Sequence, residues 1–372
     1  MRGLTILLVL TLLFSVLTPT TGASPETGYY RDWAVIRQKS AVAMLTDLGL
    51  VTGYDDGTFQ PDRPVTRAEA AKLIAGLLTE DIPDGVLCRY PDTAGNWAAG
   101  YIEFCAEEQI ISGPAGTDFR PGEAVTVREL AKMLLAVLGW DVSACTGPDW
   151  AGAVDAAAME AGLYNGDEED KSRPASREET CLLFNNALQS SVVQGYTETG
   201  EPVYELDEML QPKTLLEIRF EAVPVSGVVQ ANSAADLRTE REKLGENSIH
   251  ISGYVKDFQV SARIAQDKVL VGHRVDLYAR LGSDGNKVLG IPVFSPAEIS
   301  HTMAGRELLS AIMDVEGLTV DEDTEYYLDY VPSDTLCLEN LDESKLVTII
   351  DHEGDRVIDL VLVNHKAEDS DE

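Results

Sequence analysis

The feature that most constrains this chain is a helix-start signal that occurs three times in its first half. In each copy a Ser or Thr is followed three residues later by Glu, and an apolar run comes next. The copies are Thr66-Arg67-Ala68-Glu69, Thr126-Val127-Arg128-Glu129 and Ser176-Arg177-Glu178-Glu179. In such a capping box the hydroxyl accepts from the backbone N–H of the Glu, whose side chain reaches back to the first residue. The signal predicts helices that begin just after Thr66, Thr126 and Ser176, with Glu69, Glu129 and Glu179 as the second capping residues.

Apolar residues follow each box at helical spacing, so one face of each helix is expected to be buried. An amphipathic segment also precedes each box, at residues 40–48, 97–109 and 150–161. The boxes are 60 and 50 residues apart. A helix, loop and helix repeated at this period predict a stacked architecture, because no single unit can bury its apolar face alone.

The loops between the paired helices differ among the three copies. Gly53 and Gly113 each lie 13 residues before their box, and residues 53–61 and 113–121 share Gly, Phe and Pro. We expect these two glycines to adopt positive φ, and their backbone N–H groups could also face a ligand. In the third copy the loop is shorter and has become Asp-Glu-Glu-Asp at residues 167–170. We therefore expect the third loop to have a different role from the first two loops.

Gly-Tyr-Asp-Asp-Gly-Thr-Phe-Gln-Pro followed by Val-Thr-Arg-Ala-Glu resembles the S-layer homology (SLH) repeat, which bacteria use in triplicate to hold secreted proteins on the cell wall. The second copy has Val127 in place of the motif Arg and carries its positive charge at Arg128. The third copy keeps Arg177 but has lost the loop. The resemblance covers residues 28–192 and implies tandem repeats at 28–82, 88–140 and 145–192.

The resemblance implies an all-α pseudo-threefold bundle with ligand grooves between neighbouring repeats. The implied ligand is an anionic secondary cell-wall polysaccharide, often pyruvylated. A helix N-terminus offers unpaired N–H groups and partial positive charge, and an Arg in the first turn can bind a carboxylate bidentately. The glycan-binding candidates are Arg67, Arg128, Arg177, Trp97, Trp150, Gly53 and Gly113.

Each candidate also has a purely structural interpretation. The Thr, Ser and Glu residues of the boxes cap helices whether or not a ligand binds. An Arg in the first helical turn opposes the helix dipole, so it needs either a local acid or a ligand. Trp97 and Trp150 can pack in a core or stack on a sugar ring. The second and third copies could also serve only as scaffold.

The N-terminal residues predict export. Arg2 precedes an apolar run at residues 4–17, and small residues near Thr21 and Ala23 offer a cleavage site, so residues 1–23 are expected to be a signal peptide. The run is short for a membrane span. With no Cys near that site and an acidic tail at 367–372, we expect a secreted protein of the cell surface or wall that is held non-covalently.

Five cysteines are compatible with export. Cys88 and Cys105 lie in the second copy, and Cys145 and Cys181 bracket the third. Two local disulfides are therefore expected, with Cys337 unpaired, although sequence alone does not establish the connectivity.

The net charge of −34, from 63 acidic and 29 basic residues, limits the partners of the chain. It repels nucleic acid and anionic membranes, so neither is expected as a partner. An anionic glycan requires positive charge concentrated in the grooves, which is why the Arg positions matter. No cofactor and no specific metal site are expected, and self-association in a surface layer is a further possibility for the partners.

The length of 372 residues favours two domains and an α+β fold class. A linker is expected at 193–211 and a mostly antiparallel β domain at 212–366. The predicted strands are 215–222, 225–231, 248–255, 258–264, 274–281, 288–293, 346–350 and 357–363, and residues 283–286 suggest a hairpin turn. A short helix is expected at 297–303 or at 306–313.

We do not expect an enzyme, because five His residues show no metal-ligand spacing and no nucleophile elbow, phosphate loop or dinucleotide motif is present. Residues 351–359 resemble a calcium loop, but Arg356 stands where an EF-hand has Gly and Leu362 where it has Glu. A strand, an acidic turn at 353–355 and a returning strand fit better. The favoured function is wall anchoring of a structural or adhesive β domain. The alternative is a wall-anchored polysaccharide or peptidoglycan hydrolase whose catalytic carboxylates lie in the C-terminal half.

Overall fold

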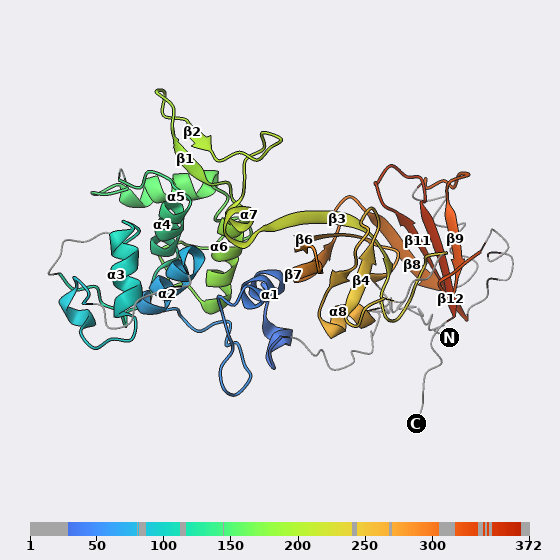
Figure 1. Ribbon diagram of the computed structural model, residues 1–372, viewed down its shortest axis with the longest axis horizontal. Helices are drawn as coiled ribbons and strands as arrows, with labels where there is room; N and C mark the ends of the chain where they lie inside the picture. The colour runs from blue at the N-terminus through green and yellow to red at the C-terminus, as the bar shows by residue number, and fades with distance from the viewer. Residues whose placement is uncertain are drawn as a thin grey trace, which may run out of the picture.

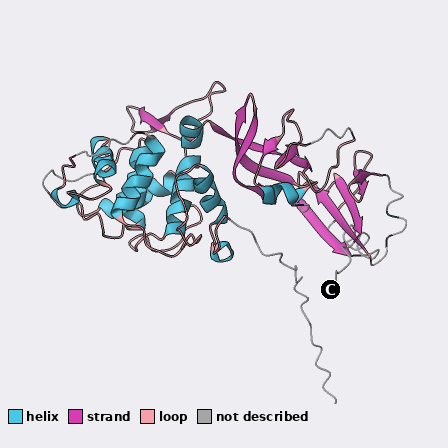
Figure 2. Ribbon diagram, turned by 60° about the horizontal axis from the view of Figure 1, so that its bottom comes forward, coloured by secondary structure: helices cyan, strands magenta, loops and turns pink. Residues whose placement is uncertain are grey.

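The computed structural model describes residues 29–79, 81, 87–111, 117–143, 145–239, 244–267, 270–304, 317–333, 338, 341 and 344–365. Within these residues the chain is mixed α+β, with a helix-rich part followed by a strand-rich part, end to end along the long axis (Figures 1 and 2). The predicted signal peptide, the acidic tail, Gly113, Cys337 and the alternative helix at 306–313 lie outside the described residues. No described helix is long and apolar enough to cross a membrane.

Three helix pairs form the helix-rich part, at the positions that the sequence predicts. They are α1 (Lys39–Asp47) with α2 (Arg67–Leu78), α3 (Ala99–Glu107) with α4 (Val127–Val137), and α5 (Trp150–Glu160) with α6 (Arg177–Gln189). Short 3-10 turns, η1 (Trp33–Val35) and η2 (Pro91–Thr93), precede the first two pairs. Each of α2, α4 and α6 begins with a capping box in which both hydrogen bonds are present.

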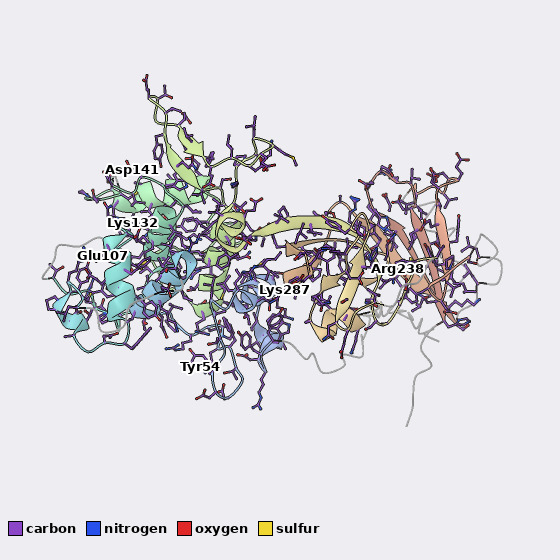
Figure 3. All side chains as sticks on the ribbon, viewed as in Figure 1. Tyr54, Glu107, Lys132, Asp141, Arg238 and Lys287 are labelled. Atoms are coloured by element: carbon purple, nitrogen blue, oxygen red, sulfur yellow. The ribbon has the colours of Figure 1, made fainter. Side chains whose placement is uncertain are left out.

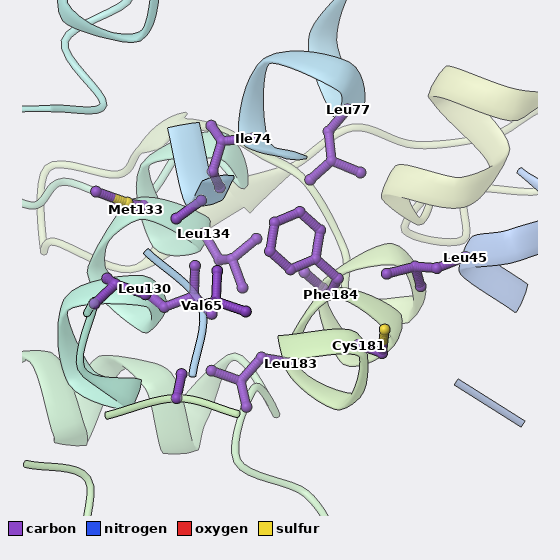
Figure 4. Packing of buried hydrophobic residues seen from close by; sticks show 14 of the residues in the cluster. Leu45, Val65, Ile74, Leu77, Leu130, Met133, Leu134, Cys181, Leu183 and Phe184 are labelled. Carbon is purple, nitrogen blue, oxygen red and sulfur yellow. The ribbon is translucent and has the colours of Figure 1, made fainter. Parts of the chain in front are cut away.

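The three helix pairs share one hydrophobic core. Figure 4 shows side chains of α1, α2, α4 and α6 that meet around Phe184. Ile74, Leu134 and Phe184 are fully buried, one from each of α2, α4 and α6. Burial of each such side chain contributes about 1.5–3 kcal/mol. The pairs therefore depend on one another for their core.

A closed ring of backbone hydrogen bonds joins the segments that immediately precede the three capping boxes. Val65 N–H donates to Ala175 O (2.9 Å), Ala175 N–H donates to Val125 O (2.9 Å), and Val125 N–H donates to Val65 O (3.0 Å). All three residues are buried. The starts of α2, α4 and α6 are thereby held around one centre.

The predicted linker at 193–211 contains a β-hairpin, β1 (Val193–Tyr196) with β2 (Pro202–Tyr204). The hairpin is docked on the end of α4, where Val193 N–H donates to Leu138 O at 2.8 Å. Gly139 has φ +81°, and a Cβ there would lie 2.0 Å from Val193 O. This close approach requires glycine, so the segment is a packed element and the linker prediction is corrected.

The strand predicted at 215–222 is instead the helix α7 (Leu215–Phe220). A fourth capping box, Thr214 with Glu217, starts it. Leu215 and Leu216 are buried, and the Arg219 guanidinium donates from Nε to Leu77 O at 2.8 Å. The local capping chemistry outweighs the strand-like composition that suggested the earlier prediction.

The next elements form a closed five-stranded barrel. Its strands are β3 (Ala222–Ala231), β4 (Ser248–Ile251), β5 (Phe258–Gln259), β6 (Arg274–Gly282) and β7 (Gly285–Phe294). The helix α8 (Ala262–Gln266) lies between β5 and β6 in the chain. The strand order is β3-β4-β5-β7-β6, and only the β5–β7 pair is parallel. OB-folds are five-stranded barrels of this general kind. The predicted β6–β7 hairpin is confirmed, whereas the strand predicted at 258–264 ends at Gln259 and gives way to α8.

A second, five-stranded sheet completes the strand-rich part. It contains β8 (Ile299–Ala304), β9 (Glu325–Leu328), β10 (Val331–Pro332), β11 (Lys345–Asp351) and β12 (Leu360–His365), in the order β10-β9-β12-β11-β8. The predicted hairpin around residues 353–355 is confirmed as β11–β12. The helix predicted at 297–303 is wrong, because β8 pairs along β11 and Thr302 Oγ1 is 2.7 Å from Thr348 Oγ1.

Polar and apolar contacts join the helix-rich part to the barrel. The Asp47 carboxylate accepts from Gly290 N–H (2.8 Å) and from Tyr29 Oη (2.9 Å). Tyr278 Oη donates to Gln189 Oε1 at 3.0 Å, and Leu289 of β7 belongs to the helical core cluster. The two parts therefore meet at a packed interface.

The predicted disulfides are absent, since Cys88, Cys105, Cys145 and Cys181 are free thiols in the described structure. Cys105 is fully buried and its Sγ donates to Ala71 O at 3.4 Å. Burial raises the pKa of Cys105 and of Cys181 to about 12. These thiols pack as small apolar groups in the core, which explains why the pairing from sequence spacing is wrong.

Candidate functional site

The starts of α2, α4 and α6 each lie against the loop of a neighbouring helix pair, which creates three comparable sites. We name them by the pairs that they join. The 3–1 site contains Arg177, Thr52, Tyr54 and Phe59; the 1–2 site contains Arg67, Phe119 and Glu129; the 2–3 site contains Arg128, Asp155 and Tyr164. The structure thus places Arg67, Arg128 and Arg177 in related positions around one centre.

The backbone N–H groups at these helix starts are already hydrogen-bonded. The first N–H of each helix donates to a neighbouring pair, from Arg67 to Glu123 O, from Val127 to Arg173 O and from Arg177 to Arg63 O, at 2.8–3.1 Å. The second N–H of each helix likewise donates, to Pro121 O, Lys171 O or Pro61 O. The third donates to the capping hydroxyl. The expectation that unpaired N–H groups bind an anion is therefore wrong, and the guanidinium groups are the donors that remain.

In the 3–1 site the Arg177 guanidinium lies over two aromatic rings. Its Cζ is 4.6 Å from the Phe59 ring centroid and 4.9 Å from that of Tyr54. Its Nε donates to Phe59 O (2.8 Å) and its Nη2 to Thr52 O (3.0 Å). Arg177 forms no ion pair with a carboxylate of any described residue. Its positive charge is therefore oriented by carbonyls and rings but not neutralised.

A second cation, Arg63, also lies over the Tyr54 ring. The Cζ of Arg63 is 5.5 Å from the Tyr54 ring centroid, and Arg63 Nη1 donates to Tyr54 Oη. Arg63 also pairs with Glu69 Oε1 at 3.0 Å. Figure 3 shows Tyr54 on the loop at the bottom of the helix-rich part. The 3–1 site thus holds two guanidinium groups around one phenol, and only one of them has a carboxylate partner in the described structure.

An acidic hollow of about 540 Å³ lies next to the 3–1 site, between the third loop and the first helix pair. Its lining includes Asp62, Glu168, Glu169 and Glu178. Glu178 is 1% exposed and accepts from the backbone N–H and from Nε of Arg37, at 2.8 and 2.6 Å. The other carboxylates disfavour an anion in the hollow itself. An anionic group is therefore favoured on the Tyr54 side of Arg177.

The 1–2 site repeats the geometry of the 3–1 site with an added carboxylate. Arg67 Nε donates to Phe119 O at 2.9 Å, and its Cζ lies 4.7 Å from the Phe119 ring centroid. Arg67 Nη1 is 3.2 Å from Glu129 Oε1. The side chain of Arg67 is 14% exposed. Its charge is thus partly compensated.

The 2–3 site is closed by a bidentate ion pair. Arg128 Nε and Nη2 donate to Asp155 Oδ1 and Oδ2 at 2.9 and 2.8 Å, and Tyr164 Oη donates to Asp155 Oδ1 at 3.0 Å. The hydrogen bond with Asp155 raises the pKa of Arg128. Val127, which replaces the motif Arg, is fully buried. This site has an internal anion where the 3–1 site has none.

Two aspartates that the sequence analysis did not single out fix the first two loops. Asp32 Oδ1 and Oδ2 accept from the N–H groups of Phe59 and Gln60, both at 2.8 Å. Asp92 accepts in the same way from Phe119 and the following residue, at 2.8 and 2.7 Å. Both aspartates follow a tyrosine by two residues and are 60 residues apart, which is the spacing of the first two boxes. This periodic Tyr-x-Asp signal could have identified them.

The other described glycan-binding candidates, Gly53, Trp97 and Trp150, contact neighbouring aromatic or core residues. Gly53 does not have positive φ, and a Cβ there would lie 2.7 Å from the Tyr30 ring, so close packing explains the glycine. Trp97 is 60% exposed and contacts Tyr101 edge-on at 6.2 Å between centroids. Trp150 packs against the helical core. No described contact joins either Trp to the three arginines.

The calcium-like loop uses its main acid for backbone hydrogen bonds. Asp351 is 1% exposed, and its carboxylate accepts from the N–H groups of Glu353, Gly354 and Arg356 at 3.1, 2.7 and 2.7 Å. No group of three or more His, Cys, Asp or Glu that could hold a metal ion occurs within the described ranges. The carboxylate of Asp351 therefore serves the β11–β12 turn.

Residues 30–71 and 89–131 match the sequence profile of the S-layer homology domain. A surface layer protein of Brevibacillus choshinensis is 32% identical over 111 residues, which cover 28% of this chain and 10% of that protein. A cellulosome-anchoring protein of Acetivibrio thermocellus is 34% identical over 98 residues, which cover 25% of this chain and 22% of that protein. An amylopullulanase of Thermoanaerobacterium thermosulfurigenes is 29% identical over 178 residues, which cover 43% and 9%.

The chain thus spans between 9 and 22% of the length of these relatives. The first matched segment includes α1 and the start of α2, and the second includes α3 and the start of α4. Together these matches indicate a secreted protein of the cell surface or cell wall.

Proposed function

We propose that the helix-rich part is a three-repeat SLH module that anchors the protein non-covalently to the cell wall by binding an anionic secondary polysaccharide. The profile matches support the first two repeats. The third repeat is supported by the capping box at Ser176 and by the ring of hydrogen bonds through Val65, Val125 and Ala175, in which each helix pair contributes one donor and one acceptor. On this proposal the helix-rich part is the anchoring domain.

The proposal rests on the partners of the Arg177 guanidinium, which donates to two backbone carbonyls and forms no ion pair with any described residue. In a chain of net charge −34, positive charge is concentrated at the 3–1 site, where Arg177 has no carboxylate partner among the described residues and the guanidinium of Arg63 lies over the same Tyr54 ring. Phe59 O and Thr52 O hold Arg177 in place. A carboxylate of the polysaccharide, such as a pyruvyl ketal, can pair with the remaining guanidinium N–H groups of Arg177.

The three sites are proposed to differ in their contribution. The 3–1 site binds the polysaccharide most strongly because its cation is not neutralised. The 1–2 site binds more weakly, because the ligand competes with Glu129 for Arg67. The 2–3 site serves as scaffold, because the ligand would have to displace the bidentate Asp155.

The strand-rich part is proposed to be a displayed domain with a structural or adhesive role, and self-association in a surface layer is compatible with it. The amylopullulanase relative supports one alternative, a wall-anchored hydrolase with catalysis in the C-terminal half. Release of reducing sugar from starch, pullulan or isolated wall glycan by the full chain would favour the hydrolase. Retention on walls without release of sugar or of muropeptide favours the displayed domain.

Sedimentation with purified cell walls tests the anchoring proposal. The wild-type chain is expected to sediment with walls and to remain soluble after chemical removal of the wall polysaccharide. Arg177→Ala is expected to lower retention at least 10-fold. Lys72→Ala is the matched control, because it removes one exposed positive charge from α2 and no described contact joins Lys72 to the three arginines. Equal retention of the two variants would refute the role of Arg177.

A further inference from the structure

A separate polar pocket lies at the opposite end of the third helix pair from the 3–1 site. It is a cavity of about 370 Å³ between the ends of α4, α5 and α6 and the β1–β2 hairpin. Arg177 and Gln189 are the two ends of α6, which at 13 residues is about 20 Å long. In Figure 3, Tyr54 of the 3–1 site lies at the bottom of the helix-rich part and Asp141, near the hairpin, lies towards its top.

The β1–β2 hairpin forms one wall of this pocket. Tyr204 of β2 lines the cavity and pairs across the hairpin with Val193, whose N–H donates to Leu138 O. Asp141 N–H donates to Tyr196 Oη at 2.8 Å, which fixes the hairpin a second time. The position of Tyr204 is therefore defined by its pairing with β1, which contacts the segment after α4 at Leu138 and at Asp141.

Several polar groups of the lining retain hydrogen-bonding capacity. Trp140 lines the pocket, and its Nε1–H is buried with no partner in the part of the chain that the structure describes. Asn186 uses its amide N–H groups for Leu163 O (2.9 Å) and Asn165 O (2.8 Å), so its carbonyl oxygen is left as an acceptor. A buried donor without an acceptor is costly, and native structures normally supply a partner for it.

Two further side chains complete the set of donors and acceptors. Gln189 accepts from Tyr278 through Oε1, which leaves its amide N–H groups as donors. Glu160, at the end of α5, contributes an exposed carboxylate. The lining therefore combines indole and amide donors, amide and carboxylate acceptors and two aromatic side chains.

We propose that this pocket binds one ring of a neutral saccharide. Each sugar hydroxyl both donates and accepts, which matches the mixed lining, and the apolar face of a sugar ring can lie on Trp140 or Tyr204. The volume is within the range of small-molecule pockets. Glu160 and the net charge of −34 disfavour an anion here. The site is thus distinct in position and in ligand charge from the arginine sites.

Saturation-transfer NMR of the full chain with glucose, galactose, N-acetylglucosamine and N-acetylmannosamine tests this proposal. At least one sugar is expected to receive saturation. Trp140→Phe, which keeps an aromatic ring but removes the unpaired N–H, and Tyr204→Leu, which removes the aromatic ring, are each expected to weaken its binding at least 10-fold. Trp97→Phe, an exposed Trp elsewhere, is expected to leave the binding unchanged, as is Arg177→Ala, which separates this site from wall anchoring.

The proposal is overturned if none of the four sugars receives saturation, or if both pocket variants bind as the wild type does. Thermal unfolding by circular dichroism checks that the variants fold. If Trp140→Phe does not fold, Tyr204→Leu alone decides, because it removes a partly exposed ring and keeps the backbone pairing of the hairpin.

Discussion

The 3–1 and 2–3 sites occupy related positions in the helix-rich part but differ in the partner of their arginine. Arg177 is held by two carbonyl oxygens and two rings, whereas Arg128 forms a bidentate pair with Asp155. A carboxylate provided by the protein stabilises the fold and removes the attraction for a carboxylate outside it. On the proposed function, an arginine in a capping-box turn binds the ligand or stabilises the scaffold according to whether a neighbouring helix supplies an acid.

The largest expected effect is on the stability of the hydrophobic core that both sites share. Phe184→Ala removes a fully buried ring from the centre of the helical core, and it is expected to lower the free energy of unfolding by about 3–5 kcal/mol. Urea unfolding measures this. The 3–1 and 2–3 sites are expected to be disrupted together. If Phe184→Ala lowered the free energy of unfolding by this amount but kept wall binding, the 3–1 site would not depend on the common core.

A smaller effect separates the two sites. Asp155→Ala leaves the partly buried Arg128 unpaired and is expected to lower the free energy of unfolding by about 2–3 kcal/mol. Asp155→Asn keeps the side-chain volume and is expected to raise retention on cell walls, because it frees one cation. Urea unfolding and wall sedimentation together test this. Unchanged stability of Asp155→Ala would contradict the scaffold role of the ion pair.

The capping boxes should contribute less. Ser176→Ala removes the hydroxyl that accepts from Glu179 N–H at the start of α6, and it is expected to cost about 1 kcal/mol. Thr126→Ala at the start of α4 is the matched variant and should cost a similar amount. Wall retention is expected to fall only for Ser176→Ala, because that cap positions Arg177. Equal loss of retention in both variants would contradict the difference between the sites.

The smallest effect is a pH dependence near the 3–1 site. Burial would raise the pKa of Glu69, but hydrogen bonds from Thr66 and the Arg63 pair outweigh it and hold that pKa below its ordinary value of 4.5. A lowered pKa contributes stability that is present above pH 4.5 and lost as the pH falls through the folded value. Thermal midpoints measured from pH 7 to 3 should decline less steeply for Glu69→Gln. Parallel curves would refute this contribution.

Sequence predicted the features that depend on local chemistry. The boxes at residues 66, 126 and 176, the helical periodicity after them and the β6–β7 and β11–β12 turns all depend on residues close together in the chain. Thr214 and Glu217 carry the same local signal at the start of α7. The helix-rich part was therefore easier to predict than the barrel, whose β5 has only two residues before α8.

The partners of the site residues depend on contacts between distant segments. Arg177 donates to a carbonyl 118 residues away, and no local pattern identifies Phe59 as its partner. The carbonyl oxygens that accept from the helix-start N–H groups also belong to neighbouring helix pairs. The local sequence therefore does not show that these N–H groups are already hydrogen-bonded and cannot serve as donors to an anion. The spacing of the cysteines suggested disulfides because sequence spacing does not report that Cys105 and Cys181 pack in a common core.

Isothermal titration of purified anionic wall polysaccharide into the wild-type chain, Arg177→Ala and Arg128→Ala tests the central claim most directly. Circular dichroism first establishes a temperature at which all three are folded. The account predicts that Arg177→Ala weakens binding at least 10-fold while Arg128→Ala stays within 2-fold of the wild type, a difference of about 1 kcal/mol or more in binding free energy. Equal affinities for the two variants, or a larger loss for Arg128→Ala, would contradict it.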